Sequence, residues 1–223
     1  MSGKIFQGKP HEASVAEIAA AYRRLQLRLS AEDSLRERRS LLLTSTRRHE
    51  GCSRVAGNLA LRFGQQKGAR VVVVELETDP GDSLSPLQAD RKKGLRQVLA
   101  GDMSLSDAIL PVGSDPTVHL LPGGLEGPVP EDLNGLSLAK VIASLADEFS
   151  HIIVDGPPVP EIPDPPLLLR AFGGVALIVE ANRTKREAVG EAIRVLNGAG
   201  ANLLGIVLTS REYFIPEWIY KRM

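Results

Sequence analysis

A polar segment near residue 50 lies between a predicted strand and a predicted helix, and its spacing suggests phosphate chemistry. It runs Thr46-Arg47-Arg48-His49-Glu50-Gly51-Cys52-Ser53. A strand, a loop and a helix in this order bind phosphate when the loop follows the pattern G-x-x-x-x-G-K-[ST]. On that pattern Thr46 stands at the first Gly, Gly51 matches the second, and Ser53 supplies the hydroxyl that faces magnesium. Cys52 stands at the Lys, whose ammonium contacts the β- and γ-phosphates.

The segment therefore lacks the principal cation of a working phosphate loop. A Cys at a helix N-terminus tends toward thiolate, which repels phosphate. Bulky residues at 46–49 also hinder the folding of backbone N–H groups into an anion-binding nest. Arg47, Arg48 and Arg54 are candidate substitutes, because a guanidinium is a good phosphate ligand. The alternative is that these arginines are solvated loop residues.

Acidic residues at the ends of two other predicted strands complete the candidate site. Asp155 ends the segment HIIVD, and Glu75 and Glu77 end a second apolar segment. Ligands of open α/β sheets bind beyond the carboxyl ends of the strands. If the site is active, Asp155, Glu75 and Glu77 are the candidate catalytic residues, and Ser53, Glu75 and Asp155 are the candidate magnesium ligands. The alternative is that Asp155 caps the following turn and that Glu75 and Glu77 are surface charges at a strand end.

The elements that position these residues alternate along the chain. Apolar, β-branched segments predict strands of a parallel sheet covered on both faces, at 40–44, 70–75, 118–121, 151–155, 174–180 and 203–209. Amphipathic segments predict helices at 14–30, 53–67, 131–149 and 184–197. Gly68 and Gly198 are predicted C-caps of the second and fourth helices, and 79–86, 122–130 and 156–166 are predicted loops. The order predicts a doubly wound, mostly parallel α/β sheet flanked by helices in three layers.

Composition excludes several classes of protein. The 223 residues carry 27 Lys plus Arg and 27 Asp plus Glu, which argues against nucleic acid as a partner. Aromatic residues make up only 4%, too few for a base-stacking platform. One cysteine excludes a disulfide scaffold. No apolar run reaches the ~18 residues of a membrane span. We expect one domain over 1–223, with an N-terminal helix at 14–30 and a C-terminal tail at 211–223.

Longer segments of the chain resemble the bacterial tyrosine kinases (BY-kinases) of capsule and exopolysaccharide synthesis, which are relatives of the MinD and ParA ATPases. The matching segments are AYRRL at 21–25, EGCSRVAGNLA at 50–60, VVVVELE at 71–77, GLRQVLAGD at 94–102, LSDAI at 105–109, LLPGG at 120–124 and IIVDGPPV at 152–159. The GL-x-x-VLAG segment distinguishes this family from other phosphate-loop proteins. The resemblance implies a phosphate-loop NTPase fold, ATP and Mg²⁺ as ligands, and a membrane polysaccharide copolymerase as partner.

The departures from the family pattern are as informative as the matches. Cys52 replaces the phosphate-loop Lys, and Arg48-His49 replaces the Pro-Gly before Glu50. The E-x-x-R-x-x-R oligomer motif of the family falls on Ala20, Arg23 and Gln26, so Arg23 alone remains as an oligomer contact. The tail holds Tyr213 and Tyr220 as candidate phospho-acceptors but no tyrosine cluster. Phosphate binding, ring contacts and phospho-acceptors are weakened together, which indicates a non-catalytic relative.

We therefore expect a catalytically impaired BY-kinase-like protein of the cytoplasm, without a cofactor, that acts in capsule or exopolysaccharide synthesis and export. It would bind the cytoplasmic segment of a membrane polysaccharide copolymerase, peripheral at the inner membrane, as a monomer or dimer rather than a ring. The alternative is an active ATP-dependent tyrosine autokinase or ATPase, in which arginines replace the Lys, Glu75 and Glu77 hold Mg²⁺, and Tyr213 or Tyr220 accepts phosphate. A MinD-like membrane or division ATPase is a third possibility.

The C-terminal tail is the one segment that these expectations leave open. It holds the single Trp of the chain, and Phe214, Ile215, Trp218 and Ile219 fall near one helical face. One interpretation is a terminal helix packed on the core. The other is a segment that docks to a partner or to the membrane surface through an apolar face flanked by cations.

Overall fold

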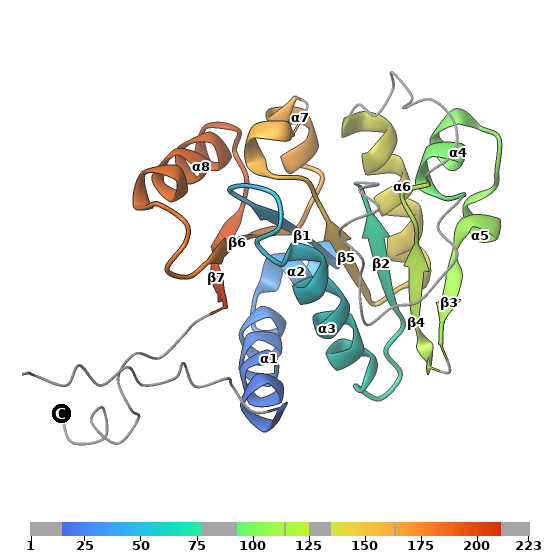
Figure 1. The fold of residues 1–223 in the computed structure, drawn as a ribbon. Coiled ribbons are helices and arrows are strands. Elements are labelled where there is room, and N and C mark those ends of the chain that lie inside the picture. Colours follow the sequence, from blue (N-terminus) through green and yellow to red (C-terminus); the bar gives the residue numbers. More distant parts are fainter. Residues whose placement is uncertain (1–14, 77–92, 114, 125–134, 163, 211–223) are drawn as a thin grey trace, which may run out of the picture.

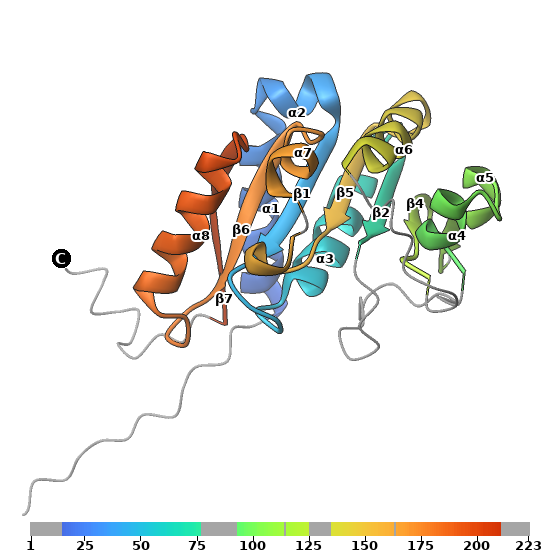
Figure 2. The same cartoon turned by 90° about the horizontal axis from the view of Figure 1, so that it is seen from above.

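The computed structural model describes residues 15–76, 93–113, 115–124, 135–162 and 164–210 (Figure 1). Seven strands form one sheet in the order β3-β4-β2-β5-β1-β6-β7, which Figure 2 shows from above. The strands are β1 (Ser40–Ser45), β2 (Val71–Glu75), β3 (Leu110–Val112), β4 (Asp115–Leu121), β5 (His151–Asp155), β6 (Gly174–Glu180) and β7 (Leu203–Thr209). All neighbours pair in parallel except β3, which is antiparallel to β4.

Helices cover both faces of the sheet. The helices are α1 (Val15–Ser30), α2 (Asp33–Arg38), α3 (Cys52–Gly64), α4 (Leu95–Ala100), α5 (Leu105–Ala108), α6 (Gly135–Glu148), the short 3₁₀ helix η1 (Val159–Glu161), α7 (Pro165–Leu169) and α8 (Arg186–Gly198). One buried cluster joins the sheet to α1 and α3, and another joins it to α6, α7 and α8. The two helical layers lie on opposite sides of the strands in Figure 1. The predicted doubly wound, mostly parallel α/β fold is confirmed.

The alternation of side chains along the strands explains the two clusters. Leu42 on β1 and Val72 on β2 belong to the cluster with α6, whereas Leu41 and Leu43 belong to the cluster with α3. Successive side chains of a strand point to opposite faces, so a strand apolar at every position supplies both cores. This is why six strands could be predicted from unbroken apolar runs.

Several predicted boundaries were wrong. Helix α3, which was predicted at 53–67, ends at Gly64. Gly68 therefore does not cap it and lies instead in the turn before β2, with φ of 76°. Gly198 is the last residue of α8, and the cap is Ala199. The predicted loop at 156–166 contains η1 and the start of α7. Strand β3 and helices α2, α4, α5 and α7 were not predicted, because three to six residues are too short to show a period.

The prediction of full coverage was also wrong for β7. It lies at an edge of the sheet, and Ile206 and Leu208 remain 45% and 56% exposed. None of the helices described is both long and apolar enough to cross a membrane.

Candidate functional site

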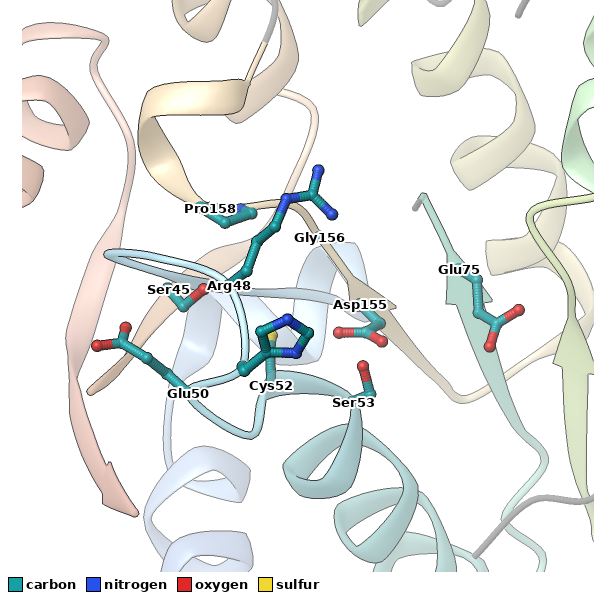
Figure 3. A pocket seen from close by; sticks show the side chains of 10 residues that line it. Ser45, Arg48, Glu50, Cys52, Ser53, Glu75, Asp155, Gly156 and Pro158 are labelled. Atoms are coloured by element: carbon teal, nitrogen blue, oxygen red, sulfur yellow. The ribbon is translucent and has the colours of Figure 1, made fainter. Parts of the chain in front are cut away.

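The carboxyl ends of β1, β2 and β5 meet around a small pocket, shown in Figure 3. Its volume is about 20 Å³. The lining residues come from the end of β1, the following loop, the start of α3 and the ends of β2 and β5: Ser45, Arg48, His49, Glu50, Cys52, Ser53, Glu75, Asp155, Gly156 and Pro158. The topology thus brings together residues from three of the segments on which the sequence prediction depended.

The loop between β1 and α3 turns through two residues with left-handed backbone conformations. His49 has φ of 65°, and Gly51, the residue that precedes the helix, has φ of 90°. Gly adopts this conformation freely, whereas His does so only occasionally. Cys52 then begins α3 and is 8% exposed. The loop therefore turns at His49 and Gly51, and a buried thiol begins the helix that follows.

Glu50 organises the loop from within. Its carboxylate accepts hydrogen bonds from the Thr46 backbone N–H at 2.8 Å, the Thr46 hydroxyl at 2.9 Å and the Arg47 backbone N–H at 3.4 Å. The hydroxyl of Thr184, in the loop between β6 and α8, also donates to it. The Thr209 hydroxyl of β7 donates to the Glu50 carbonyl oxygen at 2.7 Å. Glu50 is only 2% exposed, so these contacts tie the loop to the β6–β7 side of the sheet.

In Figure 3 the Glu50 carboxylate points away from Ser53 and Asp155, on the far side of the loop from the α3 terminus. The sequence analysis quoted Glu50 only as part of the family motif and missed this role. The available signal in the sequence was a Glu in a loop with hydrogen-bond donors such as Thr46 and Arg47. Thr184 and Thr209 lie too far along the chain for spacing to reveal them as partners of Glu50.

Carboxylates engage the two loop arginines that could substitute for the missing Lys. Arg47 bridges to Glu180 at 3.1 Å and to Glu50 at 3.4 Å. Arg48 donates from Nε to Glu161 of η1 at 3.2 Å, and a second nitrogen contacts the same carboxylate. Each guanidinium charge is therefore largely balanced in this arrangement.

Arg54 lies outside the pocket, beside Tyr22 of α1. Burial raises the pKa of the Tyr22 hydroxyl, and the nearby Arg54 charge and the Asn58 side chain partly oppose that rise. The Asn58 amide donates to the Arg54 carbonyl oxygen at 2.8 Å. Arg54 thus faces the α1–α3 contact. The pocket is lined by three of the six candidate phosphate ligands, namely Arg48, Cys52 and Ser53. The other three, Arg47, Gly51 and Arg54, do not line it.

The predicted magnesium ligands converge in part. Glu75 and Asp155 are aligned partners on β2 and β5, and both are at least nine-tenths buried. The Ser53 hydroxyl faces the Asp155 carboxylate in Figure 3. Glu75 accepts from the Gly123 backbone N–H at 3.4 Å. Among the residues that the structure describes, no three His, Cys, Asp or Glu side chains are grouped to hold a metal ion.

The other predicted site residues lie apart from the pocket or outside the described ranges. Arg23 is on an exposed part of α1. Glu77, Tyr213 and Tyr220 fall outside the residues described by the structure.

The GL-x-x-VLAG segment contacts the LLPGG turn next to the pocket. The Leu95 backbone N–H donates to the Pro122 carbonyl oxygen at 2.7 Å, and the Gly94 N–H donates to the Gln97 side chain at 2.8 Å. Gly123 of the same turn donates to Glu75. Two segments that carry the family resemblance therefore support one wall of the site.

Comparisons with known proteins find bacterial tyrosine kinases among the sequence relatives of this chain. The chain is 29% identical over 184 residues to the tyrosine-protein kinase CpsD of Streptococcus agalactiae. This alignment covers 82% of the chain and 80% of the relative. It is 24% identical over 204 residues to the putative tyrosine-protein kinase CapB of Staphylococcus aureus, covering 89% and 86%. The chain is thus similar in sequence to bacterial tyrosine-protein kinases over more than four-fifths of its length. No protein-family model matches it.

Solved structures show the same BY-kinase fold. The kinase domain of the Escherichia coli tyrosine kinase ETK superposes with a TM-score of 0.74 at 22% identity, covering 90% of this chain and 80% of that one. The kinase domain of VpsO gives the same TM-score, covering 86% and 93%. A ParA family ATPase from Chlorobium tepidum gives 0.64 at 16% identity, covering 77% and 74%. The BY-kinase resemblance and its ParA-like relatives, both predicted from the sequence, are confirmed.

Proposed function

We propose that this BY-kinase homologue is catalytically impaired and acts by binding rather than by phosphoryl transfer. The observation that carries the proposal is Cys52, buried at the first turn of α3 where a phosphate-loop Lys would stand. Phosphoryl transfer depends on positive charge positioned at the phosphates. In the structure Arg48 pairs with Glu161, and its guanidinium points away from Cys52 and Ser53 in Figure 3.

The residues of the pocket fit a magnesium–nucleotide only in part. Ser53, Glu75 and Asp155 supply a hydroxyl and two carboxylates, whereas Cys52 supplies no cation for the phosphates. We therefore assign no catalytic step to these residues.

The proposed biological setting is capsule or exopolysaccharide synthesis and export. We propose that the chain is a cytoplasmic partner of a membrane polysaccharide copolymerase, bound at its cytoplasmic segment and peripheral to the inner membrane. Homology to CpsD and CapB supports this setting.

An active tyrosine autokinase or ATPase is the second candidate. Ser53, Glu75 and Asp155 line one pocket, and these residues favour it because they retain the hydroxyl and carboxylates of a magnesium site. In that case the ligands would be ATP and Mg²⁺, and Tyr213 or Tyr220 would accept phosphate.

Nucleotide binding and turnover distinguish the two candidates. Melting of the full chain is measured with and without Mg-ATP, and phosphate release is compared with the Ser53→Ala/Asp155→Ala variant. A ligand at 100 times its Kd stabilises a protein by about 2.7 kcal/mol, which a melting curve detects readily. We expect no such shift and no turnover above the variant. Turnover that disappears in the variant would establish the active kinase or ATPase instead.

Partner binding is tested separately, by titrating a synthetic cytoplasmic segment of a copolymerase into the full chain in an isothermal calorimeter. We expect saturable binding without nucleotide. Absence of binding both with and without Mg-ATP would refute the scaffold role.

A further inference from the structure

The outer edge of β7 lacks a neighbouring strand within the described part of the chain. All seven of its residues, LLGIVLT, are uncharged. Soluble proteins usually protect an edge strand with a Lys, a Pro, a bulge or a covering segment. The only irregularity in the pairing of β7 with β6 lies at its first residues, opposite Val175 and Ala176. Within the described residues, the rest of the strand therefore presents a regular edge that no other segment pairs with.

Two apolar side chains are exposed beside this edge. Ile206 and Leu208 are aligned with Leu177 and Val179 of β6, which are buried in the α8-side core. Aligned residues of neighbouring strands share a face, so Ile206 and Leu208 lie on the α8 face. They are nevertheless 45% and 56% exposed, because α8 does not cover them fully. Figure 1 shows β7 at the margin of the sheet beside α8.

The backbone of the same two residues faces outward. The Thr209 carbonyl oxygen accepts from the Ala181 N–H at 2.9 Å, which directs the polar groups of Thr209 toward the β6 side. Hydrogen-bonding groups alternate between the two edges along a strand. Those of Leu208 and Ile206 therefore point to the outer edge, where a further strand would find both donors and apolar side chains.

The segment that follows β7 has the sequence to occupy this edge. Ser210 adopts a left-handed conformation, with φ of 51°, which turns the chain out of the strand direction. A four-residue hairpin loop over 209–212 is of ordinary length. Such a loop would place Tyr213 opposite Leu208 and Ile215 opposite Ile206, and directly opposed residues of an antiparallel pair share a face.

The position of Pro216 agrees with this register. Pro216 would lie opposite Gly205, where the backbone groups of the added strand would point outward, and a Pro there would lose no ladder hydrogen bond. Shifting the register by one residue places Pro216 opposite Ile206, where its missing N–H would leave a ladder bond unmade. The position of Pro216 therefore excludes pairings displaced by one residue, and the four-residue loop specifies the pairing among those that remain.

We propose that residues 213–215 form an antiparallel strand on the outer edge of β7, with Tyr213 and Ile215 covering Leu208 and Ile206. The short connection gives the segment an effective concentration on the order of millimolar. It should therefore outcompete a second copy of the chain at micromolar concentration. Tyr213, a candidate phospho-acceptor, becomes part of the sheet edge.

Hydrogen exchange on the full chain, resolved by residue with NMR, tests the pairing. We expect slow exchange at the amides of Ile206, Leu208, Tyr213 and Ile215, and fast exchange at Phe214, whose N–H points outward. The variant Ile215→Pro removes a ladder donor and should raise the exchange rates at Ile206 and Leu208 severalfold. The matched variant Phe214→Pro places the ring at an outward N–H and should leave those rates unchanged.

Three results would overturn the proposal. One is exchange at Ile206 and Leu208 that is as fast in the unaltered chain as in Ile215→Pro. A second is protection that grows with protein concentration while light scattering shows a dimer, because a second copy would then occupy the edge. A third is protection that appears only with vesicles of phosphatidylglycerol and phosphatidylcholine, because the tail would then bind membrane.

Discussion

The hydroxyl of Thr184 donates a hydrogen bond to the carboxylate of Glu50, 134 residues earlier in the chain. Together with the Thr209 hydroxyl, which reaches the Glu50 carbonyl oxygen, this contact fixes the phosphate-loop segment to the β6–β7 side of the sheet. The two contacts therefore join the loop between β1 and α3 to the β6–α8 loop and to the end of β7.

The first prediction concerns this carboxylate. Glu50→Gln replaces one acceptor oxygen by an NH₂ group that faces the N–H and hydroxyl donors of Thr46, Arg47 and Thr184. Leaving buried donors unsatisfied should lower the free energy of unfolding by about 2–3 kcal/mol. Urea unfolding measures the loss.

The control is Glu37→Gln, an exposed carboxylate on α2, which should change stability by less than about 0.5 kcal/mol. Equal effects of the two substitutions would mean that the Glu50 contacts add nothing to stability.

The Glu50 contacts also show where sequence analysis succeeds and where it stops. Unbroken apolar runs such as Val71–Glu75 predicted the parallel strands, because burial on both faces leaves a direct record in the sequence. Glu75 and Asp155 could be expected at one edge of the sheet, because both residues end strands that were predicted to be parallel. The partners of Arg47 and Arg48 could not be predicted, since Glu180 and Glu161 reach them only through the tertiary fold. Short elements such as β3 form because they pair with a neighbouring strand, here β4, and they are too short to show a hydrophobic periodicity in the sequence.

The second prediction concerns Gly94, at the start of the GL-x-x-VLAG segment. A Cβ atom at this position would lie 1.9 Å from the Pro122 carbonyl oxygen, so the backbone must move. Gly94→Ala should therefore lower the free energy of unfolding by about 1–3 kcal/mol, the usual cost of overpacking. Thermal or urea unfolding measures it.

Gly190→Ala on α8 is the matched control, because its Cβ would meet nothing within 4 Å and Ala favours a helix. It should be neutral or stabilising. If Gly94→Ala proved equally harmless, the close approach of the two segments would be wrong.

The third prediction concerns pH. Burial, with a smaller effect from Arg39, lowers the pKa of His151, whose ring stacks on Phe63 at 4.2 Å. The unfolded chain then binds the proton more readily than the folded protein, so stability rises with pH. The contribution of His151 is complete above about pH 6.5 and is lost as pH falls toward the lower folded pKa.

Unfolding in urea at a series of pH values between about 5 and 8 measures this slope. His151→Phe keeps an aromatic ring against Phe63 but cannot titrate, and it should flatten the profile in this range. An unchanged slope in the variant would assign the pH dependence to other groups.

The fourth prediction is that Cys52→Lys alone does not create a kinase. The added ammonium would enter a loop in which His49 keeps its left-handed turn and Arg48 remains bridged to Glu161. Incorporation of labelled phosphate into tyrosine and release of phosphate from ATP are the measurements. Tyrosine phosphorylation by the single variant would contradict the prediction. It would mean that Cys52 is the one residue of this loop that prevents phosphoryl transfer.

The last prediction is that the protein forms no closed ring. The ring motif implied by the family resemblance has a Glu and two Arg residues, and here Ala20 and Gln26 stand at two of the three positions. The Gln26 amide donates inward, to the Arg62 carbonyl oxygen of α3 at 3.1 Å, so it does not present a donor to a neighbouring copy. Arg23 remains exposed but has lost its carboxylate partner. An exposed ion pair contributes only about 0–1 kcal/mol, although a ring repeats it at each interface. Light scattering at micromolar concentration should therefore show a monomer or dimer, and a stable octamer-sized species that dissociates on Arg23→Ala would contradict the prediction.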